Sequence, residues 1–221
     1  MEVLSGSKVT LVDHMGDDYR VLEAARVSTG AEARKGDDKD RKLIQFLWKQ
    51  EHGTPFEQVV FTFKVKTPIF VARQIFRHRI SSFNEMSGRY RELPTVFFMP
   101  DEFRAQNKEG NKQGSVIDPS INQDMAASLV IASYDEAEQT YKSLLAMGVA
   151  NELARIVLPV GIYTEFYWTI NFRSLANFLH LRLDPHAQPE IQDVALQIEE
   201  IVKPLIPWIY EAFELTGKAK A

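Results

Sequence analysis

The chain of 221 residues contains no cysteine. This absence excludes disulfides, thiolate metal sites and thiol nucleophiles. The sequence also lacks a run of about eighteen apolar residues, so we expect no transmembrane helix and no membrane partner. The N-terminal stretch MEVLSGSKVTLVDHMGDD has no basic start followed by an apolar segment. We therefore expect no secretory signal, and a cytoplasmic location.

A large excess of one charge is absent as well. The chain has 26 basic and 30 acidic residues, and its sequence pI is about 5.8. A mildly acidic protein is a poor general binder of nucleic acids, so we expect no nucleic-acid partner. The 45% hydrophobic and 25% charged contents are ordinary for a globular protein with a real core.

The periodicity of apolar residues predicts few strands and many helices. Strands are predicted over residues 8–12, 59–66, 95–99 and 163–170. Helices are predicted over residues 17–27, 37–50, 67–76, 122–147, 151–158, 171–182 and from 184 onwards, with Pro204 and Pro207 interrupting the last part. This pattern favours an α+β fold with a small mixed or antiparallel sheet, packing helices and a helix-rich C-terminal half. No domain boundary is evident, so residues 1–221 are expected to form a single domain.

Several helix starts are predicted from capping residues. Thr67 followed by Pro68 suggests an N-cap with proline in the first turn. Asn151 and Asn171 are expected to cap the helices that follow them, and Asp184-Pro185 is expected to start another. Residues 100–122 are polar and are expected to form a surface excursion.

The stretch RHRISSFNEMSGRYR, residues 77–91, concentrates arginine. With Arg73, residues 73–91 contain five arginines and one acid, Glu85, but no lysine. The planar guanidinium binds phosphate or carboxylate with two parallel hydrogen bonds, whereas lysine is a point charge. The stretch is predicted to begin at a helix end and continue as polar loop. Its simplest alternative role is a solvated basic surface paired with acids elsewhere.

A second functional class stays open on these residues alone. Arg79, Arg89 and Arg91 alternate with Phe83 and Tyr90, which is typical of a stacking platform in a noncatalytic nucleotide- or RNA-binding module. The acidic pI argues against that class.

The spacing of the stretch is more specific than its charge. It reads R-H-R-x-x-S-x-N-E-x-S-x-R from Arg77 to Arg89, and further blocks are AARVS from Ala24, GTPFE from Gly53, ARIVLP from Ala154 and NFRSL from Asn171. The chain resembles the flavin-dependent thymidylate synthases in these blocks. The resemblance covers most of the chain except residues 100–145, which look like the variable region of that family.

The resemblance implies an activity and its cofactors. Such enzymes make dTMP from dUMP, with the carbon supplied by methylene-tetrahydrofolate and the reducing equivalents by NADPH through FAD. They are homotetramers whose active sites are shared between subunits. The competing nucleic-acid module would not need the second block around Asn171.

The resemblance also assigns roles to individual residues. The FAD contacts that it implies are Ser28, Thr54, Arg77, His78, Arg79, Glu85, Asn171, Phe172, Arg173, Asn177 and His186. The dUMP contacts that it implies are Gln74, Ile75, Phe76, Arg77, Glu85, Met86, Ser87, Gly88, Arg89, Arg155 and Arg182. His52 and Tyr90 are implied to lie beside the flavin or the folate.

Several of these residues have simpler structural explanations. Asn171 can be only a helix cap, Thr54 only a turn residue and Ser28 only a helix terminator. His186 can be structural. His180, Asp184 and His186 together could imitate a metal site, but the resemblance implies no metal.

The missing cysteine constrains the chemistry. An unrelated family of thymidylate synthases activates the uracil ring with a thiolate, which this chain cannot do. An arginine can instead stabilise negative charge that develops on the pyrimidine, and the resemblance places Arg182 there. Ser87 has no adjoining histidine or lysine in the motif to activate it, so a binding role is expected for it.

Overall fold

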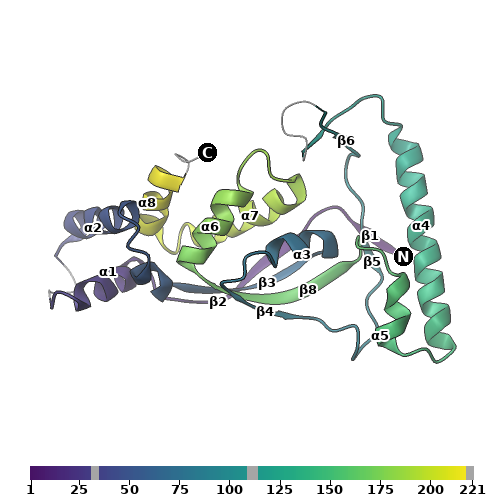
Figure 1. The fold of residues 1–221 in the computed structure, drawn as a ribbon, viewed down its shortest axis with the longest axis horizontal. Coiled ribbons are helices and arrows are strands. Elements are labelled where there is room, and N and C mark those ends of the chain that lie inside the picture. Colours follow the sequence, from purple (N-terminus) through teal and green to yellow (C-terminus); the bar gives the residue numbers. More distant parts are fainter. Residues whose placement is uncertain (31–34, 109–113, 218–221) are drawn as a thin grey trace.

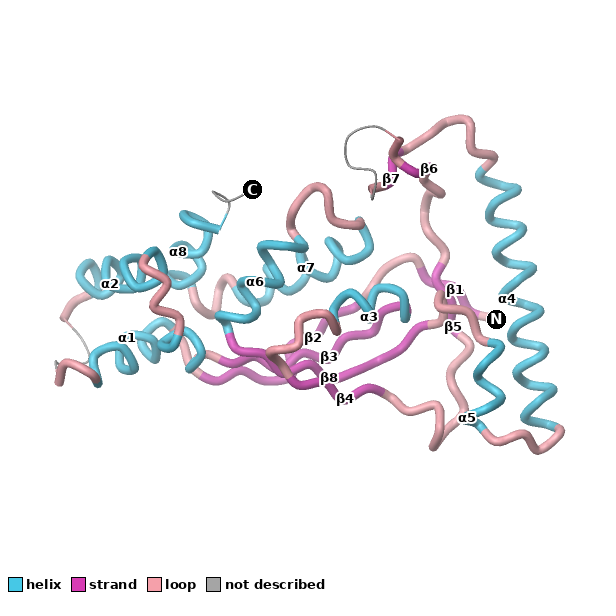
Figure 2. Tube along the Cα trace, in the orientation of Figure 1, coloured by secondary structure: helices cyan, strands magenta, loops and turns pink. Residues whose placement is uncertain are grey.

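The computed structural model describes residues 1–30, 35–108 and 114–217. Residues 109–113, which belong to the expected surface excursion, lie outside the described residues. The molecule is elongated, with a sheet in the middle and helices at both ends of the long axis (Figure 1). The tube in Figure 2 shows the same arrangement coloured by secondary structure. Of the helices in the described ranges, none is long and apolar enough to cross a bilayer.

The central sheet has four strands in the order β2-β3-β8-β4, and every neighbouring pair is antiparallel. The strands are β2 (Lys8–Met15), β3 (Val60–Pro68), β8 (Tyr163–Asn171) and β4 (Ser82–Glu85). β3 follows the predicted alternation, because Phe61, Phe63 and Val65 are fully buried. Thr62 and Lys64 lie on the opposite, polar face, where they pair with Thr169 and Glu165 of β8. The predicted α+β class with a small mixed or antiparallel sheet is confirmed, and the four-stranded sheet is antiparallel.

Helices cover one face of the sheet and extend both ends of the molecule. They are α1 (Asp18–Val27), α2 (Asp37–Lys49), α3 (Ile69–Ile75), α4 (Gln123–Ala146), α5 (Asn151–Ala154), α6 (Phe172–Arg182), α7 (Pro189–Val202) and α8 (Pro207–Gly217), with 3-10 turns at Thr54–Gln58 and Arg155–Val157. Figure 1 shows α3, α6 and α7 on one side of the sheet, α1, α2 and α8 at one end, and α4 and α5 at the other. The two ends therefore lie far apart.

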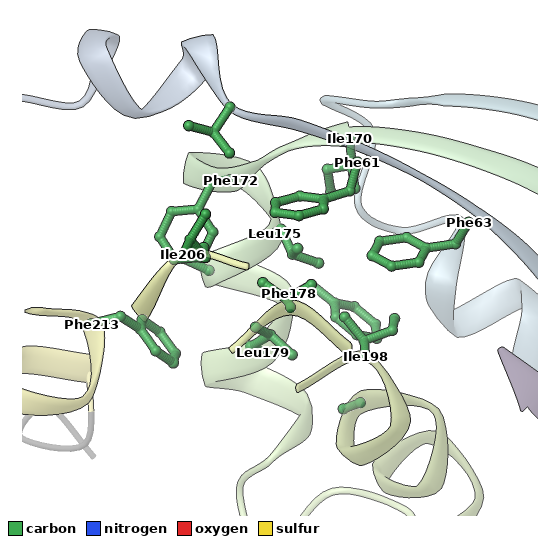
Figure 3. Close-up of a cluster of buried hydrophobic side chains, with 14 of the residues drawn as sticks. Phe61, Phe63, Ile170, Phe172, Leu175, Phe178, Leu179, Ile198, Ile206 and Phe213 are labelled. Atoms are coloured by element: carbon green, nitrogen blue, oxygen red, sulfur yellow. The ribbon is translucent and has the colours of Figure 1, made fainter. Parts of the chain in front are cut away.

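The main core lies between the sheet and the helices that cover it. Phe61 and Phe63 of β3 face Phe178 and Leu179 of α6, as Figure 3 shows. All four side chains are fully buried. Burying a side chain of this size contributes roughly 1.5–3 kcal/mol, so α6 is fixed firmly on the sheet. This anchoring sets the position of the polar residues on the other side of α6.

The opposite end has a smaller core. β5 (Val96–Phe98) pairs in parallel with β1 (Glu2–Leu4), and the ring of Tyr134 on α4 stacks on Phe97 with 4.5 Å between centroids. The Tyr134 hydroxyl donates to the Phe98 carbonyl at 2.9 Å. Gly161 allows this approach, since a Cβ there would lie 2.2 Å from the hydroxyl oxygen. Part of the expected surface excursion forms a short hairpin of β6 (Ala105–Gln106) and β7 (Ser115–Val116).

Three predicted helix starts are wrong. Thr67 lies in β3, where its hydroxyl pairs with Ser7 at 2.8 Å, and α3 begins at Ile69 without a side-chain cap. Asn151 is the first residue of α5 rather than its cap. The Asp184 carboxylate accepts from the His186 amide in a turn, and α7 begins only at Pro189. In the first and third cases a tertiary or local hydrogen bond takes the group that a cap would need.

The arginine-rich stretch is also not a loop throughout. Ser82–Glu85 forms β4, which pairs with residues 166–169 of β8. Its pairing partner lies more than eighty positions away in the sequence, so local patterning gives little sign of it.

Candidate active site

The histidine of the arginine-rich stretch is buried at the turn after α3. The His78 amide donates to the Ile75 carbonyl (3.0 Å), and the Ser81 hydroxyl donates to the His78 carbonyl (2.6 Å). The imidazole meets the Phe178 ring edge-on, with 5.0 Å between centroids. Burial, with a smaller effect of the Arg182 charge, lowers the pKa of His78 to about 4. The ring is therefore neutral at neutral pH.

Arg182 ends α6 beside this histidine. Its side chain is partly buried, and burial lowers its pKa, but a guanidinium stays charged in proteins. Within the described ranges, neither His78 Nε2 nor Arg182 Nε has a hydrogen-bond partner, although both atoms are buried. Buried polar atoms are nearly always paired. Two orphaned atoms on electrostatically interacting residues indicate a place where a ligand completes the hydrogen bonding.

The neighbouring arginines carry unneutralised charge. Arg73, Arg77 and Arg79 are exposed or partly exposed, and none of them forms an ion pair with another residue that the structure describes. The alternative of a basic surface paired with acids elsewhere therefore does not hold for these three. Glu85, in contrast, is held in place, because its Oε1 accepts from the buried Thr164 hydroxyl at 2.6 Å.

A second group of predicted residues gathers near α5. The Glu152 carboxylate accepts from Arg89 Nε at 3.0 Å, and the Glu152 carbonyl accepts from Arg155 Nε at 3.3 Å. Gly88 is buried against them, since a Cβ there would lie 3.1 Å from Arg155 Cδ. The Ser87 hydroxyl accepts from the Arg89 amide at 3.3 Å. Two exposed guanidinium groups and a hydroxyl form a set of donors that suits a phosphate.

A third group of predicted residues lines a cavity. This first cavity has a volume of about 650 Å³ and lies between α2, α6 and α8. Among the predicted residues, Arg173, Asn177 and His52 line it. Its apolar walls include Trp48 and Phe213. The cavity therefore combines flat apolar surface with a few polar donors, which is typical of cofactor sites.

Two neighbours fix Arg173 at the edge of this first cavity. Its Nη1 donates to Glu57 Oε1 at 2.6 Å. Its Nε lies where a side chain on Gly53 would be, because a Cβ on Gly53 would be 2.4 Å away. The block GTPFE thus supplies both the glycine against which the Arg173 side chain packs and the carboxylate that pairs with its charge.

His186 lies in a different place from Arg173. It lines a second cavity of about 510 Å³, together with Gln188. The Gln188 side chain accepts from the predicted dUMP residue Gln74 at 2.8 Å. His186 Nδ1 lies 2.9 Å from Asp184 Oδ1. This local contact is what the alternative structural role of His186 would require.

The remaining predicted residues occupy varied positions. Asn171 caps α6 by accepting from the Ser174 amide at 2.9 Å, and Ser28 terminates α1 by donating to the Ala25 carbonyl at 3.0 Å. The side chains of Phe172 and Ile75 are fully buried. Those of Phe76 and Met86 are partly buried, and Tyr90 is exposed. Thr54 begins the 3-10 turn that precedes β3. Phe172 and Ile75 can therefore meet a ligand only through their backbones in this arrangement.

A stacking platform is not formed. The Phe83 ring packs inward, parallel to Trp168 at 5.8 Å and edge-on to Phe76 at 4.8 Å. Only Tyr90 of the two expected platform rings is exposed. This packing removes the main support for a nucleic-acid-binding module.

One chain does not bring all the predicted residues together. The first cavity lies at the α2–α8 end, whereas Arg89 and Arg155 lie by α5 at the other end (Figure 1). The two implied folate neighbours are divided in the same way, since His52 lines the first cavity and Tyr90 adjoins Arg89.

Two polar residues of the first cavity region were not among the predicted site residues. His180 lines the cavity, and Glu57 holds Arg173. His180 follows Arg173 and Asn177 at seven and three positions, so the helical spacing alone could have indicated it. Glu57 gave no such signal, because its partner lies 116 positions away. In the part of the chain that the structure describes, no group of three or more His, Asp or Glu residues could hold a metal ion.

Comparisons with known proteins agree over nearly the whole chain. The family model described as "Thymidylate synthase complementing protein" matches residues 10–208. The flavin-dependent thymidylate synthase of Thermosipho africanus is 51% identical over 212 residues, covering 96% of this chain and 92% of that protein. The chain belongs to the flavin-dependent thymidylate synthase family. A member from Thermus thermophilus is 49% identical, covering 96% of this chain and 77% of that protein.

A solved structure shares the fold. The UMP/dUMP methylase PolB from Streptomyces cacaoi, bound with 5-Br dUMP, has a TM-score of 0.90 at 38% identity and covers 98% of each chain. The range matched by the family model, residues 10–208, contains both the stretch from Arg77 to Arg89 and the block that carries Arg173 and Asn177.

Proposed function

We propose that this chain is an enzyme that makes dTMP from dUMP, with methylene-tetrahydrofolate as carbon donor and with NADPH as reductant through FAD. The observation that carries the proposal is the pair of buried, unpartnered atoms His78 Nε2 and Arg182 Nε. Three arginines close to His78 in the sequence form no ion pair in the described part of the chain. The names of the relatives and of PolB support both the flavin and the nucleotide.

The residues present fit a flavin dinucleotide. The orphaned His78 Nε2 needs a partner, and the first cavity offers apolar walls beside the donors Arg173 and Asn177. We assign FAD binding to His78, Arg79, Arg173 and Asn177. The further FAD residues of the proposal are Ser28, Thr54, Arg77, Glu85, Asn171, Phe172 and His186. When bound, FAD supplies a hydride carrier, which no side chain of the protein provides.

The nucleotide is assigned to the arginines of the other groups. Arg89 and Arg155, with Ser87 and the buried Gly88, form the phosphate site of the proposal. Glu152 already orients the Arg89 guanidinium, so little side-chain freedom is lost on binding. Arg182 is assigned to the pyrimidine. The further dUMP residues of the proposal are Gln74, Ile75, Phe76, Arg77, Glu85 and Met86.

Arg182 replaces the thiolate that the chain lacks. A guanidinium beside the pyrimidine stabilises negative charge as it develops on a ring nitrogen and its flanking carbonyl. Because His78 is neutral, Arg182 carries the positive charge of this pair, and the imidazole can contact the flavin as a neutral hydrogen-bonding group. Partial burial strengthens the field of Arg182 relative to water.

The active site is proposed to be shared in a homotetramer. Arg173 and Asn177, two of the residues assigned to FAD, line the first cavity at the α2–α8 end of the molecule, and residues assigned to the nucleotide phosphate lie by α5. Contacts between different subunits would bring the two ends together. The same division of His52 and Tyr90, the proposed folate neighbours, supports a site built from more than one chain.

Anaerobic turnover tests the proposed function. Purified protein with reduced FAD, dUMP and methylene-tetrahydrofolate should form dTMP, and omission of the folate should abolish it. The protein as purified should be yellow with flavin absorbance. A colourless preparation that retains nucleic acid and forms no dTMP would support the noncatalytic module instead.

A further inference from the structure

The exposed side of α6 presents a row of polar residues to the first cavity. Arg173, Asn177 and His180 follow one another at spacings of four and three, so they lie on one face of the helix. All three line the same cavity. The opposite face of α6 is apolar and packs into the core through Leu175, Phe178 and Leu179. The anchored core side thus holds the polar row in a fixed direction.

His180 has no evident structural task in this row. Its side chain is partly buried, and its ring makes no hydrogen bond to another residue within the described ranges. The carboxylate of nearby Asp184 pairs with His186 instead. The imidazole is therefore available to a ligand in the cavity.

The chemistry around His180 favours an anion attached to a flat ring. Arg173, Asn177 and His180 offer N–H donors from one side, and His52 adds a second imidazole from the loop after α2. Trp48 and Phe213 supply apolar wall. Such donors suit the oxygens of phosphate groups, and FAD contains two phosphates in its pyrophosphate bridge.

We propose that His180 is a further ligand-contacting residue of the first cavity, where it donates to the pyrophosphate of FAD alongside Arg173 and Asn177. This inference rests on the proposed function, since it takes FAD as the occupant of the cavity. It adds a residue that the sequence motifs do not mark. Riboflavin has the same ring but neither phosphate, so a contact to the pyrophosphate should affect the binding of FAD and not that of riboflavin.

Binding measurements on the full-length chain test the assignment without any turnover. The dissociation constants of FAD and riboflavin are measured by flavin fluorescence for wild type, His180→Ala and His180→Asn, and ADP is used as a competitor. His14→Ala is the matched control, because His14 is exposed on β2 and does not line the cavity. Circular dichroism confirms that each variant is folded, and His180→Asn serves if the alanine variant is not.

The expected result is a loss of FAD affinity of about tenfold in His180→Ala, the scale of a hydrogen bond to a charged group. ADP competition should weaken similarly, while riboflavin affinity should stay unchanged. His180→Asn keeps a donor and should lose less, and His14→Ala should bind FAD like wild type. Unchanged FAD affinity in both folded His180 variants overturns the inference, as does an equal loss for riboflavin.

The two proposals fail in distinguishable ways. Wild-type protein that binds FAD and forms dTMP, with His180 variants that bind FAD normally, removes only His180 from the site. Wild-type protein that binds no flavin overturns the proposed function, and the assignment of His180 with it.

Discussion

The imidazole of His78 and the ring of Phe178 meet edge-on, 5.0 Å apart, next to the charge of Arg182. Protonation of His78 is disfavoured there by burial and then by that charge, which lowers its pKa from 6.5 to about 4. A histidine with a depressed pKa stabilises the folded state above its unfolded pKa. This stability is lost as the pH falls from about 6.5 towards 4.

The flavin-free protein should therefore lose stability on acidification through this histidine. Between pH 6.5 and 4 the contribution is at most about 1.4 kcal/mol per pH unit. His78→Asn, which cannot titrate, should show a shallower fall of the unfolding free energy over that range. Chemical denaturation at several pH values measures both curves. Parallel curves for wild type and variant would show that His78 is not protonated on unfolding.

Because Glu57 and Gly53 hold the Arg173 side chain in place, changing either residue should alter the affinity for flavin. Glu57→Gln removes the counter-charge of Arg173, and an exposed ion pair of this kind is worth about 0.2–1 kcal/mol. The affinity for FAD should therefore fall by a few fold. Gly53→Ala should cost more, because its Cβ would lie 2.4 Å from Arg173 Nε and displace the guanidinium. Flavin fluorescence titration measures the dissociation constant of each variant.

A matched control separates this effect from a general loss of stability. Glu211→Gln breaks the ion pair between Glu211 and Arg41. The side chains of this pair are about as exposed as those of the Arg173–Glu57 pair. Neither Arg41 nor Glu211 lines the first cavity. Glu211→Gln should bind FAD normally, and an equal loss in both glutamate variants would remove Glu57 from its positioning role.

The separation of Arg89 from Asn177 predicts complementation between subunits. At low dUMP and FAD concentrations, Arg89→Ala and Asn177→Ala should each be nearly inactive, because each binds one ligand weakly. Mixing them under conditions of subunit exchange should restore part of the dTMP-forming activity, since each mixed tetramer would contain some sites in which both residues are intact. An active monomer in light scattering at the assay concentration would contradict shared sites, as would mixed tetramers without recovered activity.

The elements that sequence patterns predicted well are those whose signals are local. The alternation of Val59, Phe61, Phe63 and Val65 gave β3, and Asn171 caps α6 as its sequence position suggested. Thr67 misled because its hydroxyl pairs with Ser7, some sixty positions away. β4 was missed for the same reason, since its partner strand β8 is distant in the sequence.

The sequence indicated candidate site residues, but it did not indicate how they are arranged in space. The motif identified His78 and Arg89, and the block after Asn171 identified Arg173 and Asn177. Their separation into groups at the two ends of the molecule depends on how the helices pack. The spacing of residues in the sequence does not encode that packing. The support of Arg173 by Glu57 likewise arises only when β8 and α6 bring Arg173 beside the turn at Thr54–Gln58.

In the proposed reaction, Arg182 takes the place of the thiolate that the chain lacks. Arg89 is assigned to the phosphate, which does not change during the reaction, so Arg89→Ala should weaken dUMP binding but leave the rate at saturation nearly intact. Arg182→Ala should slow the reaction at saturation by roughly a hundredfold or more, the scale of an oxyanion donor. Arg182→Lys should not restore it fully, because lysine lacks the planar fork.

Single-turnover oxidation of reduced flavin, with saturating dUMP and methylene-tetrahydrofolate, measures this difference most directly. We expect a near-normal rate for Arg89→Ala and a rate lowered by about two orders of magnitude for Arg182→Ala, each per folded and ligand-saturated site. A normal rate in Arg182→Ala, accompanied only by lower stability, would contradict this expectation.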